Sequence, residues 1–214
     1  MSENHTSKPM QYSYIITAVV SIVLIVLVYL FIKNKKKEKD MDNTSQFVIA
    51  EDRNPLFNER INPTHNEAIN PTHNEAINPT HNEAINPIHN QAINPINNQD
   101  INPLYHESIN PYHNEAINPL HNQAIHPVHN PNLQYFHYFN LENIAEYMVI
   151  PAEGNNFFAY LDASYQLKQY AVGNGAKGLN IFSMQQEWIG YLVSDQEGGY
   201  VQFDTKNNWV GYLK

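Results

Sequence analysis

The chain has 214 residues and a net charge of −9, from 12 basic and 21 acidic side chains, and it contains no cysteine. Without cysteine it forms neither disulfides nor thiolate metal sites, and it has no cysteine nucleophile. The acidic surplus lies entirely after residue 52. A surface of that sign repels phosphate backbones, which argues against a nucleic-acid partner.

The first predicted element is a transmembrane helix at residues 14–32, after a short tail at residues 1–13. This segment, YIITAVVSIVLIVLVYLFI, has nineteen residues and no charge. As a helix it spans about 28 Å, close to the thickness of the hydrocarbon core. A cleaved signal peptide is the alternative, but lysines follow the run where a small-residue cleavage site belongs. We therefore expect single-pass anchoring in a lipid bilayer.

The flanking charges predict the orientation of this helix. One lysine, Lys8, precedes it, and a basic linker at residues 33–52 follows it. The linker lysines nearest the helix are Lys33, Lys35, Lys36, Lys37 and Lys39. Because lysine is enriched on the cytoplasmic side, we expect the C-terminal region to be cytoplasmic. The opposite orientation is the less favoured alternative.

Residues 53–132 form ten octapeptide repeats of the pattern I-N-P-x-H-N-(E/Q)-A. A proline at every eighth position forbids a continuous helix and weakens a β-ladder, so the pattern predicts a string of short turns. Each octad offers one isoleucine and one alanine for burial, too little to order an isolated unit. The repeats are thus interpreted as a stalk or spacer, with a thin solenoid built around an isoleucine ladder as the alternative.

Histidine recurs at the fifth octad position, which raises the hypothesis of a metal site. These residues are His65, His73, His81, His89, His113, His121 and His129. A spacing of eight places no two on adjacent helical turns, and no paired carboxylate joins them. We interpret them as polar turn residues with a possible response to pH, and we expect neither a metal nor another cofactor.

Residues 133–214 are rich in aromatic side chains and are predicted to form a mostly β domain. Three segments align without gaps: MVIPAEGNNFFAYL at 148–161, LNIFSMQQEWIGYL at 179–192 and YVQFDTKNNWVGYL at 200–213. Each reads as two strands around a polar turn, the pattern of a β-hairpin. Since one hairpin is marginal alone, several are expected to pack around an axis.

The repeated W-(I/V)-G-Y-L hairpins resemble the 4-fold β-flower domain. This resemblance implies a shallow, symmetric, barrel-like fold of four hairpins around an apolar centre, with no established activity and no catalytic residues. Residues 162–178 are the candidate for a fourth, degenerate hairpin. The stretch 140–147 is compatible with a short helix packed on the barrel.

No catalytic constellation is evident. Gly173-Asn-Gly175-Ala-Lys-Gly178 matches the dinucleotide fingerprint G-x-G-x-x-G, but a strand is predicted after it where that fingerprint requires a helix. It is interpreted as a flexible connector. His137 is the one imidazole of the domain, and no serine lies in a nucleophile-elbow motif. We predict that the protein is not an enzyme.

The candidate site residues are aromatic side chains shared by the hairpins. They are Phe157, Tyr160, Trp188, Tyr191, Trp209 and Tyr212. Core packing is their favoured interpretation, and a ligand-binding or sugar-stacking surface is the alternative. The favoured function is a membrane-anchored binding or scaffolding protein for an unknown protein or small apolar ligand. The alternative is an exported surface protein that binds glycan or cell wall.

Overall fold

The computed structural model describes residues 47–214. The predicted transmembrane segment at 14–32 lies outside the described residues. Within residues 47–214 no helix is both long enough and apolar enough to cross a bilayer. The chain divides into two compact units, and the second, residues 45–214, contains everything described below.

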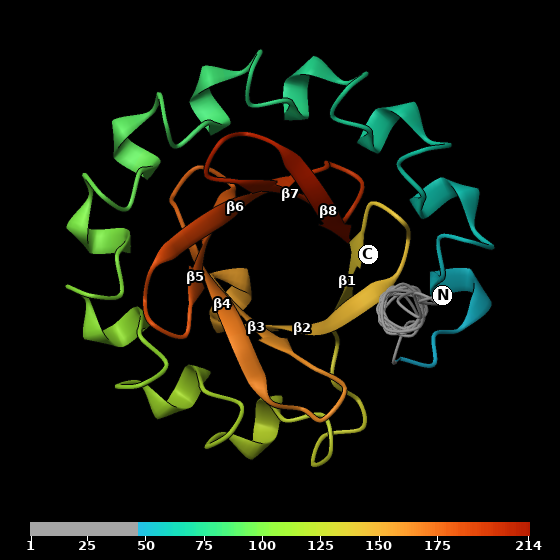
Figure 1. Cartoon of the computed structure of the whole chain (residues 1–214). Helices are drawn as coiled ribbons and strands as arrows, with labels where there is room; N and C mark the ends of the chain where they lie inside the picture. Colours follow the sequence, from blue (N-terminus) through green and yellow to red (C-terminus); the bar gives the residue numbers. More distant parts are fainter. Residues whose placement is uncertain (1–46) are drawn as a thin grey trace, which may run out of the picture. The chain divides into compact units, whose positions relative to one another are not determined.

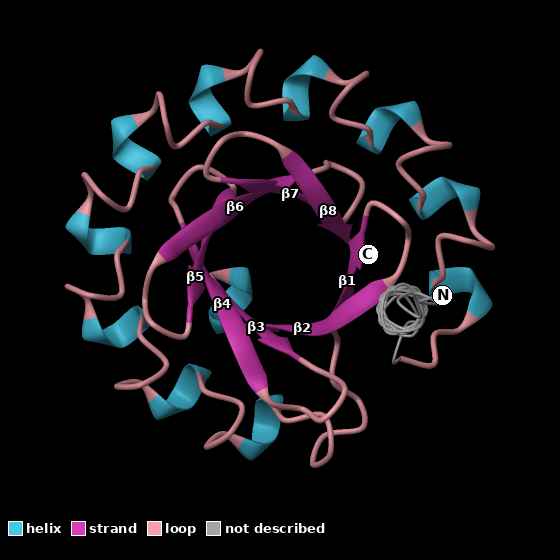
Figure 2. Cartoon of the chain, in the orientation of Figure 1, coloured by secondary structure: helices cyan, strands magenta, loops and turns pink. Residues whose placement is uncertain are grey.

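The aromatic-rich region folds into a closed antiparallel barrel in which each strand pairs with its sequence neighbour and β8 pairs with β1. Figures 1 and 2 show the barrel along its axis. The strands are β1 (Phe136–Asn140), β2 (Ala145–Ala152), β3 (Phe157–Leu161), β4 (Leu167–Gly173), β5 (Gly178–Ser183), β6 (Trp188–Ser194), β7 (Tyr200–Asp204) and β8 (Trp209–Leu213). The prediction of a mostly β, barrel-like C-terminal domain is confirmed.

Four equivalent hairpins make up the barrel: β1–β2, β3–β4, β5–β6 and β7–β8. In each hairpin the pairing register shifts at the same place, between the last two paired residues of the first strand. Each turn also begins with a side-chain oxygen that accepts backbone N–H groups, and reaches a positive φ three residues later. The turn-starting residues are Asn140, Asp162, Ser183 and Asp204. Short polar side chains favour this turn geometry, so the same local chemistry recurs four times.

Three details of the predicted hairpins were wrong. Residues 162–178 contain β4, which completes the hairpin that begins with β3, so this segment is not a hairpin of its own. The segment 148–161 spans β2 and β3, which belong to neighbouring hairpins, so it is one strand out of phase with 179–192 and 200–213. The stretch 140–147 is a turn followed by β2, and no helix forms there. Aromatic and β-branched neighbours at 136–139 and 147–150 provide strand partners that override the local helix preference.

The barrel centre is filled by buried side chains from seven strands and by the partly buried Tyr200 of β7. The buried residues of this cluster are Tyr138, Val149, Phe158, Tyr160, Ala171, Leu179, Ile181, Leu192 and Leu213. The Tyr160 hydroxyl donates to Gln202 Oε1 at 3.2 Å and links β3 with β7 across the interior. Gly211 is required because a Cβ there would lie 2.5 Å from the Tyr138 ring. The interior is therefore a packed core.

The octads form a regular chain of 3₁₀ turns. Ten of these helices are η1 (Glu51–Arg53), η2 (Glu59–Ile61), η3 (Glu67–Ile69), η4 (Glu75–Ile77), η5 (Glu83–Ile85), η6 (Gln91–Ile93), η7 (Gln99–Ile101), η8 (Glu107–Ile109), η9 (Glu115–Ile117) and η10 (Gln123–Ile125). An eleventh, η11 (Glu153–Asn155), connects β2 with β3. The prediction of repeated short turns is confirmed.

In most octads two asparagines join the octad to the one before it. The Asn70 side chain accepts from Thr72 N and donates to the Pro63 carbonyl, seven residues earlier, at 2.9 Å. The Asn74 side chain accepts from Ala76 N and donates to the Ala68 carbonyl at 2.6 Å. The same two patterns recur along the repeat. Each asparagine thus satisfies one turn internally and bonds it to the octad before it.

The octads wrap around the barrel as an open ring (Figure 1). Their isoleucines point inward: Ile77 packs with Tyr191 and Phe203, and Ile117 packs with the cluster that contains Tyr170. Asn180 Nδ2, on β5, donates to the Ile93 carbonyl at 2.9 Å. The favoured interpretation of the repeat as a spacer does not agree with this arrangement, because the barrel supplies the apolar partner that an isolated octad lacks.

Candidate functional site

The two ends of the barrel differ, and each faces one rim of the ring. We call the end with turns 140–144, 162–166, 183–187 and 204–208 the tip end, and the end with connectors 153–156, 174–177 and 195–199 the connector end. Tyr112, at the fourth octad position, donates to the Met184 carbonyl in a tip turn at 2.7 Å. Asn114, at the sixth position, contacts Glu153 in a connector. The fourth position therefore lies at the tip end and the sixth at the connector end.

A groove of about 460 Å³ lies at the connector end, between the ring and the barrel. It is lined by Ala76, Asn82, Ile85, Asn174, Ala176, Lys177, Gly178, Leu192, Val193, Ser194 and Gln196. Ring residues form one wall, and the ends of β5 and β6 with their connectors form the other. Such a volume is in the range of small-molecule sites.

The β4–β5 connector gives the groove its shape. The Asn174 side chain is buried and accepts from Ala176 N and Gly178 N, which tightens the turn. Gly178 is necessary because a Cβ there would lie 2.5 Å from the Leu192 carbonyl oxygen. Lys177, the residue before Gly178, has a φ of 62° and an exposed side chain. A rigid turn thus presents one cation at the groove.

This connector contains the G-x-G-x-x-G match. The prediction that a strand follows it is confirmed, since β5 begins at Gly178. The segment is a hydrogen-bonded turn and lacks the helix N-terminus that holds a pyrophosphate. A second hollow of about 360 Å³ shares Lys177, Gly178 and Ser194 with the groove and is also lined by Tyr200. Lys177 therefore borders both hollows.

The chemistry of the groove is that of binding. Ile85, Leu192 and Val193 supply apolar surface, while Ser194 and Gln196 supply hydrogen-bonding groups. Such a lining favours a small ligand with an apolar body, polar substituents and one anionic group opposite Lys177.

Four of the six predicted aromatic residues are buried. Tyr160 lies in the barrel centre, and Phe157, Tyr191 and Tyr212 lie on the outer face of the barrel. The Tyr191 hydroxyl donates to Asn207 Oδ1 at 2.6 Å, in the next hairpin's turn. Tyr212 donates in the same way to Asn143, and burial raises the pKa of both phenols well above the usual value. These two tyrosines join neighbouring hairpins and stay protonated.

The two tryptophans are partly buried on the outer face. The Trp188 indole N–H donates to the Gly190 carbonyl at 2.7 Å, and that of Trp209 donates to the Gly211 carbonyl at 2.9 Å. Each indole therefore bonds within its own strand. The structurally equivalent positions in the other hairpins, Ala145 and Leu167, are not aromatic.

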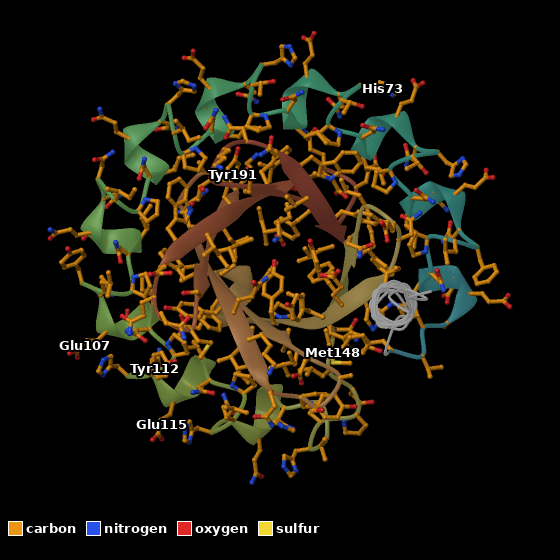
Figure 3. The ribbon with its side chains drawn as sticks, in the orientation of Figure 1. His73, Glu107, Tyr112, Glu115, Met148 and Tyr191 are labelled. Atoms are coloured by element: carbon orange, nitrogen blue, oxygen red, sulfur yellow. The ribbon has the colours of Figure 1, made fainter. Side chains whose placement is uncertain are left out.

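The seven repeat histidines lie exposed on the ring, as His73 does in Figure 3. Within residues 47–214 no group of three or more metal-ligating side chains is found. His137 behaves differently: it is buried on β1 among Phe47, Tyr135 and Phe139, and its Nδ1 lacks a hydrogen-bond partner. Burial, with a contribution from the nearby Arg53 charge, lowers the pKa of His137 from 6.5 to about 4.

Sequence reasoning missed the groove. Its residues come from the third, fourth and fifth octads and from two connectors, and no spacing rule links these segments. The sequence offered one signal, which is Asn174. An asparagine side chain can accept backbone N–H groups from the residues after it and so stabilise a tight turn.

Comparison with known proteins reveals no relative. No family model matches the chain, no curated protein matches it, and no solved structure matches it.

Proposed function

We propose that this chain is a membrane-anchored, non-enzymatic binding protein that captures a small ligand in the groove at the connector end. The groove carries the proposal, because its walls come from both the ring and the barrel. Wrapping the octads around the barrel therefore creates a concave surface that neither part has alone. We take the ligand to be a small organic anion with an apolar body, since Lys177 is the one cation among the groove's lining residues.

Saturation-transfer NMR with indole-3-acetate as the probe tests this assignment on the full-length chain. We expect a saturable signal in the wild type and its loss in Ala176→Trp, which fills the groove. The matched control is Ala92→Trp, an exposed ring position outside the groove, which should leave the signal unchanged. Lys177→Gln should weaken binding several-fold by removing the ion pair. Equal signals from wild type and Ala176→Trp would refute the groove as the site.

Membrane anchoring and a cytoplasmic domain belong to the same proposal. They are supported by the uncharged residues 14–32 and by the lysines that follow them. A fluorescent or enzymatic reporter fused after Lys214 tests the orientation, since a cytoplasmic reporter is expected and a signal only outside the cytoplasm would exclude it. The latter result would instead favour the exported, glycan-binding alternative.

The four equivalent hairpins support a further part of the proposal, that the barrel is of the 4-fold β-flower type. Three connectors and the β8–β1 pairing relate the hairpins around one axis. A crystal structure in which the hairpins did not superpose by successive rotation would exclude it.

A further inference from the structure

The ring exposes a series of large apolar side chains at one octad position. In the last six octads the fourth residue is large and apolar, and each such side chain is exposed. We call these residues the rim row: Ile88, Ile96, Leu104, Tyr112, Leu120 and Val128. Ile96 is 70% exposed. Isolated apolar residues on a surface are ordinary, but six exposed apolar side chains at the same position of consecutive octads indicate an interaction surface.

The rim row lies on one side of the domain. Consecutive octads repeat the same turns, so their fourth positions follow one rim of the ring. The bond from Tyr112 to Met184 places that rim at the tip end. Ile189, near the tip of the β5–β6 hairpin, is also exposed and adds to the apolar surface at this end. The ligand groove is at the other end, so the two surfaces are independent.

The described chain begins against the outer face of the barrel. Phe47 and Ile49 pack with Ala145 and Tyr212, and the Phe47 ring lies 5.4 Å from that of His137. Fourteen residues, 33–46, connect this point to the predicted membrane span. A chain of that length reaches at most about 50 Å. The tether is therefore long enough for the tip end, with its rim row, to meet the bilayer.

We infer that the rim row rests on the surface of the bilayer to which the chain is anchored, with the groove facing away. Aliphatic residues would enter the boundary between headgroups and acyl chains, and Tyr112 would sit at headgroup level. The tip turns carry acids such as Glu142 and Glu187, so the geometry favours a neutral headgroup over an anionic one. This inference rests on the proposed membrane anchoring.

The absence of cysteine makes a direct test simple. The labelled single variants are Ile96→Cys, in the rim row, and Ala92→Cys, at the eighth octad position, each carrying an NBD fluorophore. The equivalent eighth-position residue Ala76 lines the groove at the connector end, so Ala92 marks the opposite rim. The full-length chain is placed as one copy per nanodisc of phosphatidylcholine, with or without nitroxide-labelled phosphatidylcholine. Both positions are exposed, so neither substitution should disturb folding.

We expect the nitroxide to quench the label at position 96 at least twofold more than the label at position 92. A second pair, Leu120→Cys and Ala116→Cys, should behave alike. Equal quenching at the two rims would overturn the inference while leaving the anchor intact. Rim-row labels that are shielded only when two copies share a disc would also overturn it, in favour of self-association. Failure of the chain to enter nanodiscs would instead refute the proposed anchoring.

Discussion

Truncating one inward isoleucine tests whether the ring and the barrel form a single cooperative unit. Ile77 is completely buried and packs with Tyr191, Val193, Val201 and Phe203, all on the barrel. Ile77→Ala leaves a cavity that a closed barrel cannot collapse to fill. Comparable substitutions cost roughly 2–5 kcal/mol.

This cost is measurable as a shift in melting temperature. For a unit of this size each kcal/mol lowers Tm by about 2–4 °C, so a loss of about 3 kcal/mol corresponds to roughly 6–12 °C. The assay is thermal unfolding of the full-length chain followed by tryptophan fluorescence, because Trp188 and Trp209 report on the barrel. Ile96→Ala removes an equally large but exposed side chain and should change Tm little. If Ile77→Ala and Ile96→Ala melted alike, the ring would be an independent spacer and the packing argument would be refuted.

Three further predictions concern buried polar groups. Asn86→Asp should destabilise the ring by about 1.5–3 kcal/mol in chemical denaturation, because a carboxylate cannot donate to the Pro79 carbonyl as the buried amide does. The control is Asn97→Asp, at an exposed position, which should be nearly neutral. Lys214→Met should lower the free energy of unfolding by about 3–5 kcal/mol, because it leaves the buried Asp195 carboxylate without its ion pair. The double variant Asp195→Asn/Lys214→Met should restore stability if the unpaired carboxylate is the cause. His137 has a folded-state pKa of about 4, below its unfolded value of 6.5, so its contribution is complete above pH 6.5 and is lost as the pH falls toward 4. Between pH 7.5 and pH 5 the loss amounts to about 2 kcal/mol, and His137→Phe should remove that part of the pH dependence; an unchanged slope would show that another group is responsible.

The octads show how far local pattern carries a prediction. Proline at every eighth residue, preceded by asparagine in nine octads and by His126 in the tenth, specifies a turn from backbone geometry alone, and this turn forms in all ten repeats. The second role of the asparagines, bonding one octad to the one before, depends on the pitch of the assembled ring. That pitch is a property of successive turns in space and does not appear in any single octad.

In the hairpins, too, local pattern predicted the type of structure but not how the strands pair. Alternation of aromatic and β-branched residues around polar turns identified a barrel-like β domain. The phase was misassigned at 148–161 because Phe157-Phe-Ala-Tyr160 resembles the W-x-G-Y sequences of β6 and β8, although it forms β3, the first strand of its hairpin. Register is set by which neighbours share hydrogen bonds, and a short motif repeated on both strands of a hairpin does not distinguish them.

The sequence by itself determined the turn chemistry of the repeat, the β character of the C-terminal region and the candidate membrane span, because each depends on residues close together in the chain. Only the tertiary structure decided that the repeat encircles the barrel, that Ile77 and its equivalents find their apolar partner there, and that a groove opens at one end while the rim row lies at the other. Burial of an isoleucine requires a surface supplied by residues a hundred positions away, and that contact follows from the closed geometry of the barrel.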